Sequence, residues 1–150
     1  MTEVLFYHLT ESTLEEALPG LLERTLQRGW RAVVQAGSAE RRDALDARLW
    51  TYRDESFLAH GCDHEPHAEF QPILLTDGTA NPNAAEVRFL VDGASPPSDT
   101  GAYVGVVFMF DGHDEAQLEG ARREWKIQKA AGHEVAYWQQ TPDRRWARKS

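Results

Sequence analysis

This 150-residue sequence has a single cysteine and no apolar run approaching the length of a membrane span. The lone thiol, Cys62, has no partner for an internal disulfide, which agrees with a reducing compartment. Crossing a bilayer takes roughly 20 apolar residues, and the N-terminus lacks the basic segment of a secretory signal. The sequence therefore predicts a soluble, cytoplasmic protein with no membrane partner.

Positive charge is also scarce. The chain holds 16 Lys and Arg against 24 Asp and Glu, a net charge of -8, which argues against a surface that binds nucleic acid all over. The balance is uneven, because residues 111–150 carry 8 cations and 7 acidic residues, whereas residues 1–110 carry 8 and 17. The basic character is thus confined to the C-terminal end.

Hydrophobic patterning predicts alternating strands and helices in one domain, residues 1–150. Apolar runs predict six strands, at 4–9, 31–36, 72–76, 86–91, 103–110 and 134–139. Helical spacing predicts three helices, one capped by Ser12 or Thr13 and ending at Gly29, one from Ser38 to Tyr52, and one from Asp114 to Gly132. Residues 53–71 are predicted to be a loop, and the chain from Thr141 a tail. The βαβ order predicts a three-layer α/β/α fold around a mainly parallel sheet.

Glycine is missing where a nucleotide-binding α/β fold would need it. Such sites place glycines directly after the first strand, so that backbone amides can approach a phosphate. Here residues 9–13 read Leu-Thr-Glu-Ser-Thr, and Gly37 after the second strand stands alone. The sequence therefore predicts a Rossmann-like topology without a nucleotide site.

The helix predicted after Asp114 has the most distinctive surface. At about 100° per residue, Arg122, Trp125, Lys126 and Lys129 share an arc of about 100°, so an indole lies among three cations. This face suits an anion attached to an apolar group. Alternatively, the cations complement the helix dipole on a solvated face while Trp125 packs inward.

A second cluster offers four metal ligands within eight residues, His60, Cys62, His64 and His67. Three of them could hold zinc in an open site of a metal-dependent enzyme, but their spacing matches no zinc motif. The chain also has no G-x-S-x-G nucleophile motif, and Cys62 lacks a local activating signature. The residues thus predict no catalytic site, cofactor or metal, and the metal-dependent enzyme is an alternative.

Several segments, in order and spacing, resemble the chi subunit family of bacterial DNA polymerase III. They are Phe6-Tyr7, Leu49 to Leu58 with His60-Gly61, Gln71 to Thr76, Phe110 to Gly112, Ala121-Arg122, Trp125-Lys126, Lys129, Gly132-His133, Tyr137 to Gln140, and Trp146. The resemblance covers almost the full length. It implies a non-catalytic accessory subunit of the clamp-loader assembly, with an α/β/α fold and with His60 anchoring a loop.

The family resemblance also implies partners. Family members bridge the polymerase to single-stranded-DNA-binding protein by gripping its acidic C-terminal tail, which ends in an apolar residue and a free carboxylate. By motif position, Arg122, Trp125 and Lys129 fall at the tail-binding helix and Trp50 at the family's nearby aromatic, whereas Lys126 is added from helical geometry. Leu118 stands where some relatives carry a lysine. The family further binds psi or another clamp-loader component, and meets DNA indirectly.

Direct binding of single-stranded DNA is the other alternative. Tryptophans beside basic residues could act as stacking platforms for bases. The net charge of -8 weighs against this interpretation.

Overall fold

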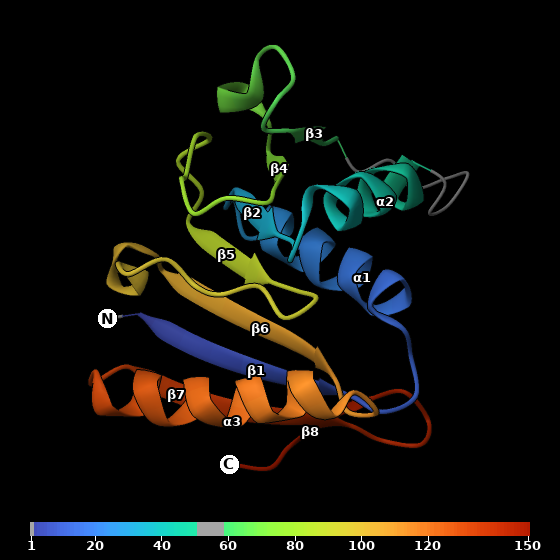
Figure 1. The fold of residues 1–150 in the computed structure, drawn as a ribbon, viewed down its shortest axis with the longest axis vertical. Helices are drawn as coiled ribbons and strands as arrows, with labels where there is room; N and C mark the ends of the chain where they lie inside the picture. Colours follow the sequence, from blue (N-terminus) through green and yellow to red (C-terminus); the bar gives the residue numbers. More distant parts are fainter. Residues whose placement is uncertain (1, 51–58) are drawn as a thin grey trace.

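Eight strands form one sheet, in the order β3-β4-β2-β5-β6-β1-β7-β8 (Figure 1). The computed structural model describes residues 2–50 and 59–150. The strands are β1 (Glu3–Leu9), β2 (Ala32–Gln35), β3 (Gly61–Cys62), β4 (Ile73–Thr76), β5 (Val87–Leu90), β6 (Gly105–Asp111), β7 (Glu134–Gln140) and β8 (Trp146–Arg148). All neighbouring pairs are parallel except β7 and β8. The predicted α/β fold with a mainly parallel sheet is confirmed.

Three helices begin where polar side chains cap their first turns. In α1 (Leu14–Gln27), Thr13 and Glu16 form the reciprocal capping box, so the cap is Thr13 and not Ser12. The Ser38 hydroxyl accepts a hydrogen bond from the Arg41 amide at the start of α2 (Ala39–Trp50). Asp114 caps α3 (Glu115–Ala130). Within the described ranges, none of these helices has the length and apolar character to cross a bilayer.

The helices lie on opposite faces of the sheet. Helices α1 and α2 pack with the apolar cluster that contains Leu9, Val34 and Leu75, whereas α3 packs with the cluster that contains Phe6, Phe108 and Phe110 (Figure 1). Side chains alternate between these clusters along each strand. The register of β1 therefore decides which of its residues face α3.

Three features differ from the sequence prediction. Strand β3 and a short helical turn, Ala68–Phe70, occupy the predicted loop, of which residues 53–58 lie outside the described residues. Strand β8 forms in the predicted tail because it pairs with the edge of β7, a contact with no local signature. Strand β5, predicted from an apolar run, also buries a charged side chain, that of Arg88.

Among the residues that the structure describes, Arg88 is the largest fully buried side chain. Its guanidinium donates two hydrogen bonds to the Gln35 Oε1, at 3.1 and 2.8 Å, and one to the Tyr103 hydroxyl, at 2.9 Å. It also donates to the carbonyls of Gly78 and Ala80, at 2.6 and 3.0 Å. These five bonds to uncharged oxygens join β5 to β2, to the loop before β5 and to Tyr103, which precedes β6. Charge-assisted bonds of this kind offset the cost of burying the cation.

Replacing Arg88 by alanine should lower the free energy of unfolding by roughly 3–5 kcal/mol, because the change opens a cavity and leaves buried acceptors unpaired. Urea denaturation followed by circular dichroism measures the effect. The control is Arg145→Ala, whose side chain is 85% exposed and which should change stability by less than about 0.5 kcal/mol. Equal midpoints for the two variants would contradict the structural role of Arg88.

Candidate functional site

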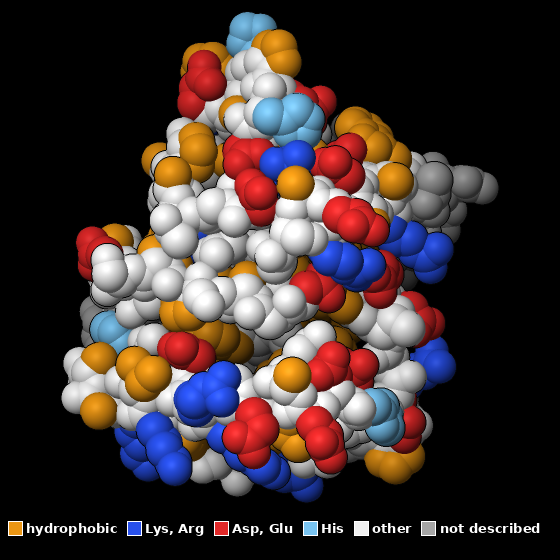
Figure 2. All heavy atoms as spheres, in the orientation of Figure 1, with side chains coloured by type: hydrophobic (Ala, Val, Ile, Leu, Met, Phe, Trp, Pro, Cys, Tyr) orange, Lys and Arg blue, Asp and Glu red, His pale blue; other side chains and the backbone are white. Residues whose placement is uncertain are grey.

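The exposed side of α3 contains the cations predicted to form a site. Figure 2 shows Lys and Arg side chains gathered over α3, with carboxylates between them. Trp125 is half-buried and packs edge-on against Phe6, at 5.5 Å between ring centres, and against Tyr137, at 5.9 Å. The Lys129 Nζ lies 5.8 Å from the centre of the Trp125 ring. Trp125 thus packs inward and still offers part of its ring to a cation at the surface.

Arg122 lies one helical turn before Trp125 on α3. Its side chain is 67% exposed, and its guanidinium is 3.8 Å from the Glu119 carboxylate. The cation is near enough to His8 and Tyr137 to act on both. Burial, His113 and Arg122 together lower the pKa of His8. Burial raises the pKa of Tyr137, and Arg122 opposes that rise.

His8 and Tyr137 extend the site, and the sequence did not predict that they lie beside α3. The His8 Nδ1 and the Tyr137 hydroxyl are 2.6 Å apart, and the imidazole stacks on Phe110. Gly112 passes so close to the imidazole that a Cβ at this position would overlap it. These residues come from strands β1, β6 and β7, which are neighbours only in space. The sequence could have predicted that His8, Phe110 and Tyr137 meet only if the order of the strands in the sheet had been known.

The structure does not bring every predicted site residue together. Arg122, Trp125 and Lys129 form one group with His8 and Tyr137, hereafter the α3 site, and Lys126 is exposed on the same helix. Trp50 is 53% exposed at the end of α2, where its ring lies 4.3 Å from that of His60. Helix α2 lies far from α3, across the sheet (Figure 1). Leu118 packs against the core under α3.

The turn that would hold phosphate in a nucleotide-binding fold is closed. The backbone amides of Thr10, Glu11 and Ser12 all donate to the Gln140 Oε1, at 3.3, 2.9 and 2.9 Å. The Gln140 Nε2 donates to the Ser12 hydroxyl, at 2.8 Å, and Gln140 is buried. A side-chain amide therefore fills the position that an anion would take at the start of α1.

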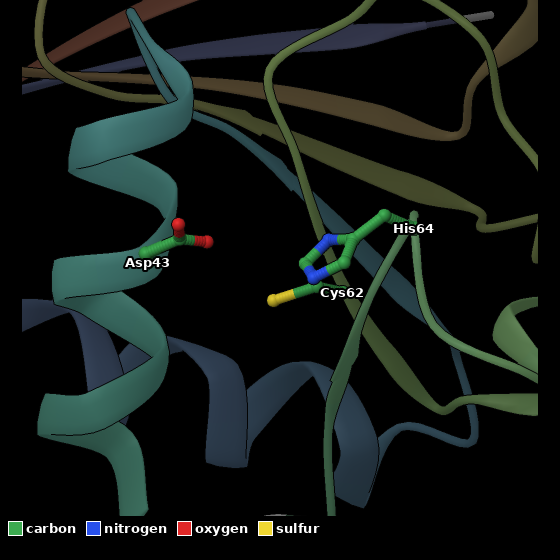
Figure 3. A group of neighbouring side chains, drawn as sticks. All are labelled: Asp43, Cys62 and His64. Atoms are coloured by element: carbon green, nitrogen blue, oxygen red, sulfur yellow. The ribbon is translucent and has the colours of Figure 1, made fainter.

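The structure groups potential metal ligands differently from the set considered in the alternative of a metal-dependent enzyme. Donor atoms of Asp43, Cys62 and His64 lie within 4.8 Å of one another, and Figure 3 shows Asp43 on α2 facing Cys62 of β3 and His64 of the turn that follows β3. A second group joins Cys62 to Asp46 and Glu65. Within the described residues, these groups include neither His60 nor His67. The His60 Nε2 instead lies 3.0 Å from the Asp46 Oδ1, which anchors β3 to α2.

Cys62 has the environment of an unreactive thiol. It is buried, and burial, with the nearby carboxylates of Asp46 and Glu65, raises its pKa to about 12. The thiolate is the nucleophilic form of cysteine, so a raised pKa suppresses its reactivity. This environment is unlike that of an activated nucleophile.

Comparison with known proteins agrees with the resemblance in the sequence. The family model described as DNA polymerase III chi subunit, HolC, matches residues 1–136. A protein named probable DNA polymerase III subunit chi, from Rickettsia prowazekii (strain Madrid E), is 29% identical over 91 residues. That match covers 61% of this chain and 55% of the relative, so it spans about half of the relative's length.

Arg122→Ala should raise the pKa of His8 toward its ordinary value of 6.5, because a cation that opposes the imidazolium is removed. NMR titration of the histidine ring signals measures the shift, and Arg123→Ala, on the same helix, is the matched control. A His8 pKa that is the same in both variants would contradict the proximity of Arg122.

The lowered pKa of His8 also makes the stability of the unchanged protein depend on pH. As the pH falls, the unfolded state takes up this proton before the folded state does. His8 therefore supports stability above pH 6.5, and that support is lost as the pH falls through the folded-state pKa.

Cys62 in the folded protein should react with iodoacetamide at pH 8 at least about 100-fold more slowly than in urea, because folding raises its pKa and buries it. Mass spectrometry of the time course measures both rates. Comparable rates would contradict the buried, protonated thiol.

Proposed function

Because this chain belongs to the DNA polymerase III chi subunit family, we propose that it is a replication accessory subunit that bridges the clamp-loader assembly to single-stranded-DNA-binding protein. The α3 site binds the acidic C-terminal tail of that partner. The protein acts without an active site of its own and works in the cytoplasm. Its second partner is psi or another clamp-loader component, and these two partners connect it indirectly to DNA.

One observation carries the proposal: Arg122 and Lys129 flank a half-buried indole on one helical face. A guanidinium can bind a terminal carboxylate through two parallel hydrogen bonds. The exposed part of Trp125 offers an apolar wall to the last side chain of the tail, and Lys126 and Lys129 attract the aspartates before it. Glu119, 3.8 Å from Arg122, releases the guanidinium when the stronger carboxylate pair forms.

The His8 and Tyr137 side chains beside α3 add a second contribution to tail binding. The His8 and Tyr137 pair supplies polar groups next to Arg122. An anion bound there favours the imidazolium form of His8, so tail binding is coupled to proton uptake. The bound tail therefore raises the pKa of His8, which is the reverse of what Arg122 does alone.

Calorimetric titration with an acidic peptide ending in Ile-Pro-Phe and a free carboxylate tests the proposal. We expect a complex in the micromolar range, about 8 kcal/mol, that weakens with added salt. Arg122→Ala and amidation of the peptide should each weaken binding at least about 10-fold, since each removes one half of the same ion pair. Lys129→Ala should weaken binding less, because a lysine contributes a point charge.

Two controls make the titration specific. Arg123→Ala removes an equal charge from the same helix and should leave the affinity within about twofold. Trp50→Ala tests the aromatic implied by the family, and since Trp50 lies away from α3 we expect little change with a short peptide. Absence of binding at low salt, or equal losses for Arg122→Ala and Arg123→Ala, would refute the α3 site.

A further inference from the structure

The sheet face opposite α3 contains a groove of about 740 Å³ that the proposed function does not use. Helix α1 packs mainly on β2 and β6, and α2 on β3 and β4, so the described helices leave β1 and β7 open on this face. Leu5, Tyr7 and Trp138 line the groove from these strands, and α1 forms one wall. Helices usually cover both faces of a mainly parallel sheet, and here the described helices leave the β1 and β7 part of this face uncovered.

The rings of Tyr7, Trp30 and Trp138 line this groove, and Trp146 adjoins it through Tyr7. Tyr7 and Trp138, which are paired across β1 and β7, stack with 6.5 Å between ring centres. Trp146 of β8 packs edge-on against Tyr7 at 4.9 Å, and Trp30 lines the wall near the end of α1. All four rings are half-buried, so each keeps part of its surface in solvent. Partly exposed rings are the platforms on which nucleic-acid bases stack.

Arginines border the rings on both sides. Arg24 of α1 and Arg28, which caps the end of that helix, lie near enough to the Tyr7 hydroxyl to counter the pKa rise that burial causes there. The Arg28 guanidinium lies 5.5 Å from the centre of the Trp30 ring. Arg148 lines the groove from β8. Two carboxylates, Glu3 and Glu134, also line it, so the lining carries three cations and two anions in a chain whose net charge is -8.

We propose that this groove, hereafter the aromatic groove, binds a short stretch of single-stranded DNA. The rings accept bases by stacking, and the arginines on either side neutralise the phosphates. From Glu3 to Tyr7 the strand spans ~13 Å, a length that suits a few nucleotides. Glu3 and Glu134 can accept hydrogen bonds from base amino groups. The sheet separates the groove from α3, so DNA and an acidic tail can bind at the same time, and the inference stands without the tail site.

Fluorescence anisotropy of a labelled oligothymidylate of about 12 nucleotides, titrated with the full chain, tests the proposal. Binding should weaken with salt, with a log–log slope of about -2 for three neutralised phosphates. The double variant Arg24→Ala/Arg28→Ala should weaken binding at least about 5-fold and flatten the slope, since two phosphate contacts are lost. Trp138→Leu should weaken binding with the slope unchanged, because it removes stacking and no charge.

The matched control is Arg144→Ala/Arg145→Ala, which removes the same charge from exposed positions outside the groove and should keep the affinity within twofold. Equal urea midpoints for both double variants establish that folding is unaffected. No anisotropy change at low salt would overturn the proposal, as would equal losses in the two double variants. It would also be overturned if DNA fails to bind while a helical peptide with leucines on one face and glutamates on the other binds through Arg24 and Arg28.

Discussion

The structure depends on one strand pairing, in which β1 lies between β6 and β7 and is parallel to both. Because strand side chains alternate, this register sends Phe6 and His8 toward α3 and sends Leu5 and Tyr7 to the other face. The same strand thus supplies the floor of the α3 site and the floor of the aromatic groove. A slip of one residue would exchange the two sets, placing Tyr7 under Trp125 and His8 in the groove.

Local patterns in the sequence predicted most of the fold. Apolar runs located the six longer strands, and polar residues at Thr13, Ser38 and Asp114 marked the helix starts, because strand periodicity and helix capping act within a few residues. What could not be predicted depends on distant partners. Strand β8 exists through its pairing with β7, and Arg88 is tolerated in a buried strand because Gln35, Tyr103 and two carbonyls meet it there.

In the candidate site, too, local patterns predicted some features, and others depend on residues distant in sequence. Helical geometry predicted that Arg122, Trp125 and Lys129 share a face. Trp125 packs on Phe6 beneath Lys129, as the interpretation of an inward-packed indole predicted, whereas anion binding at this face stays a prediction. His8 and Tyr137 join that face only through the order of strands. Gln140 is a further case, because the missing glycines predicted an absent nucleotide site but not that a side-chain amide fills the turn. Trp50 lies on α2, and no local pattern predicts its distance from α3.

The central place of β1 also has a cost during synthesis. Glu3 pairs with Gly105 and Glu134, so the first strand made has partners that are among the last. At about 5–20 residues per second, β1 waits roughly 5–30 s on the ribosome for β7. Contacts so distant in sequence slow folding, and an apolar strand with two open edges is prone to wrong pairing while it waits. The arrangement that places β1 between β6 and β7 leaves the nascent chain in need of protection.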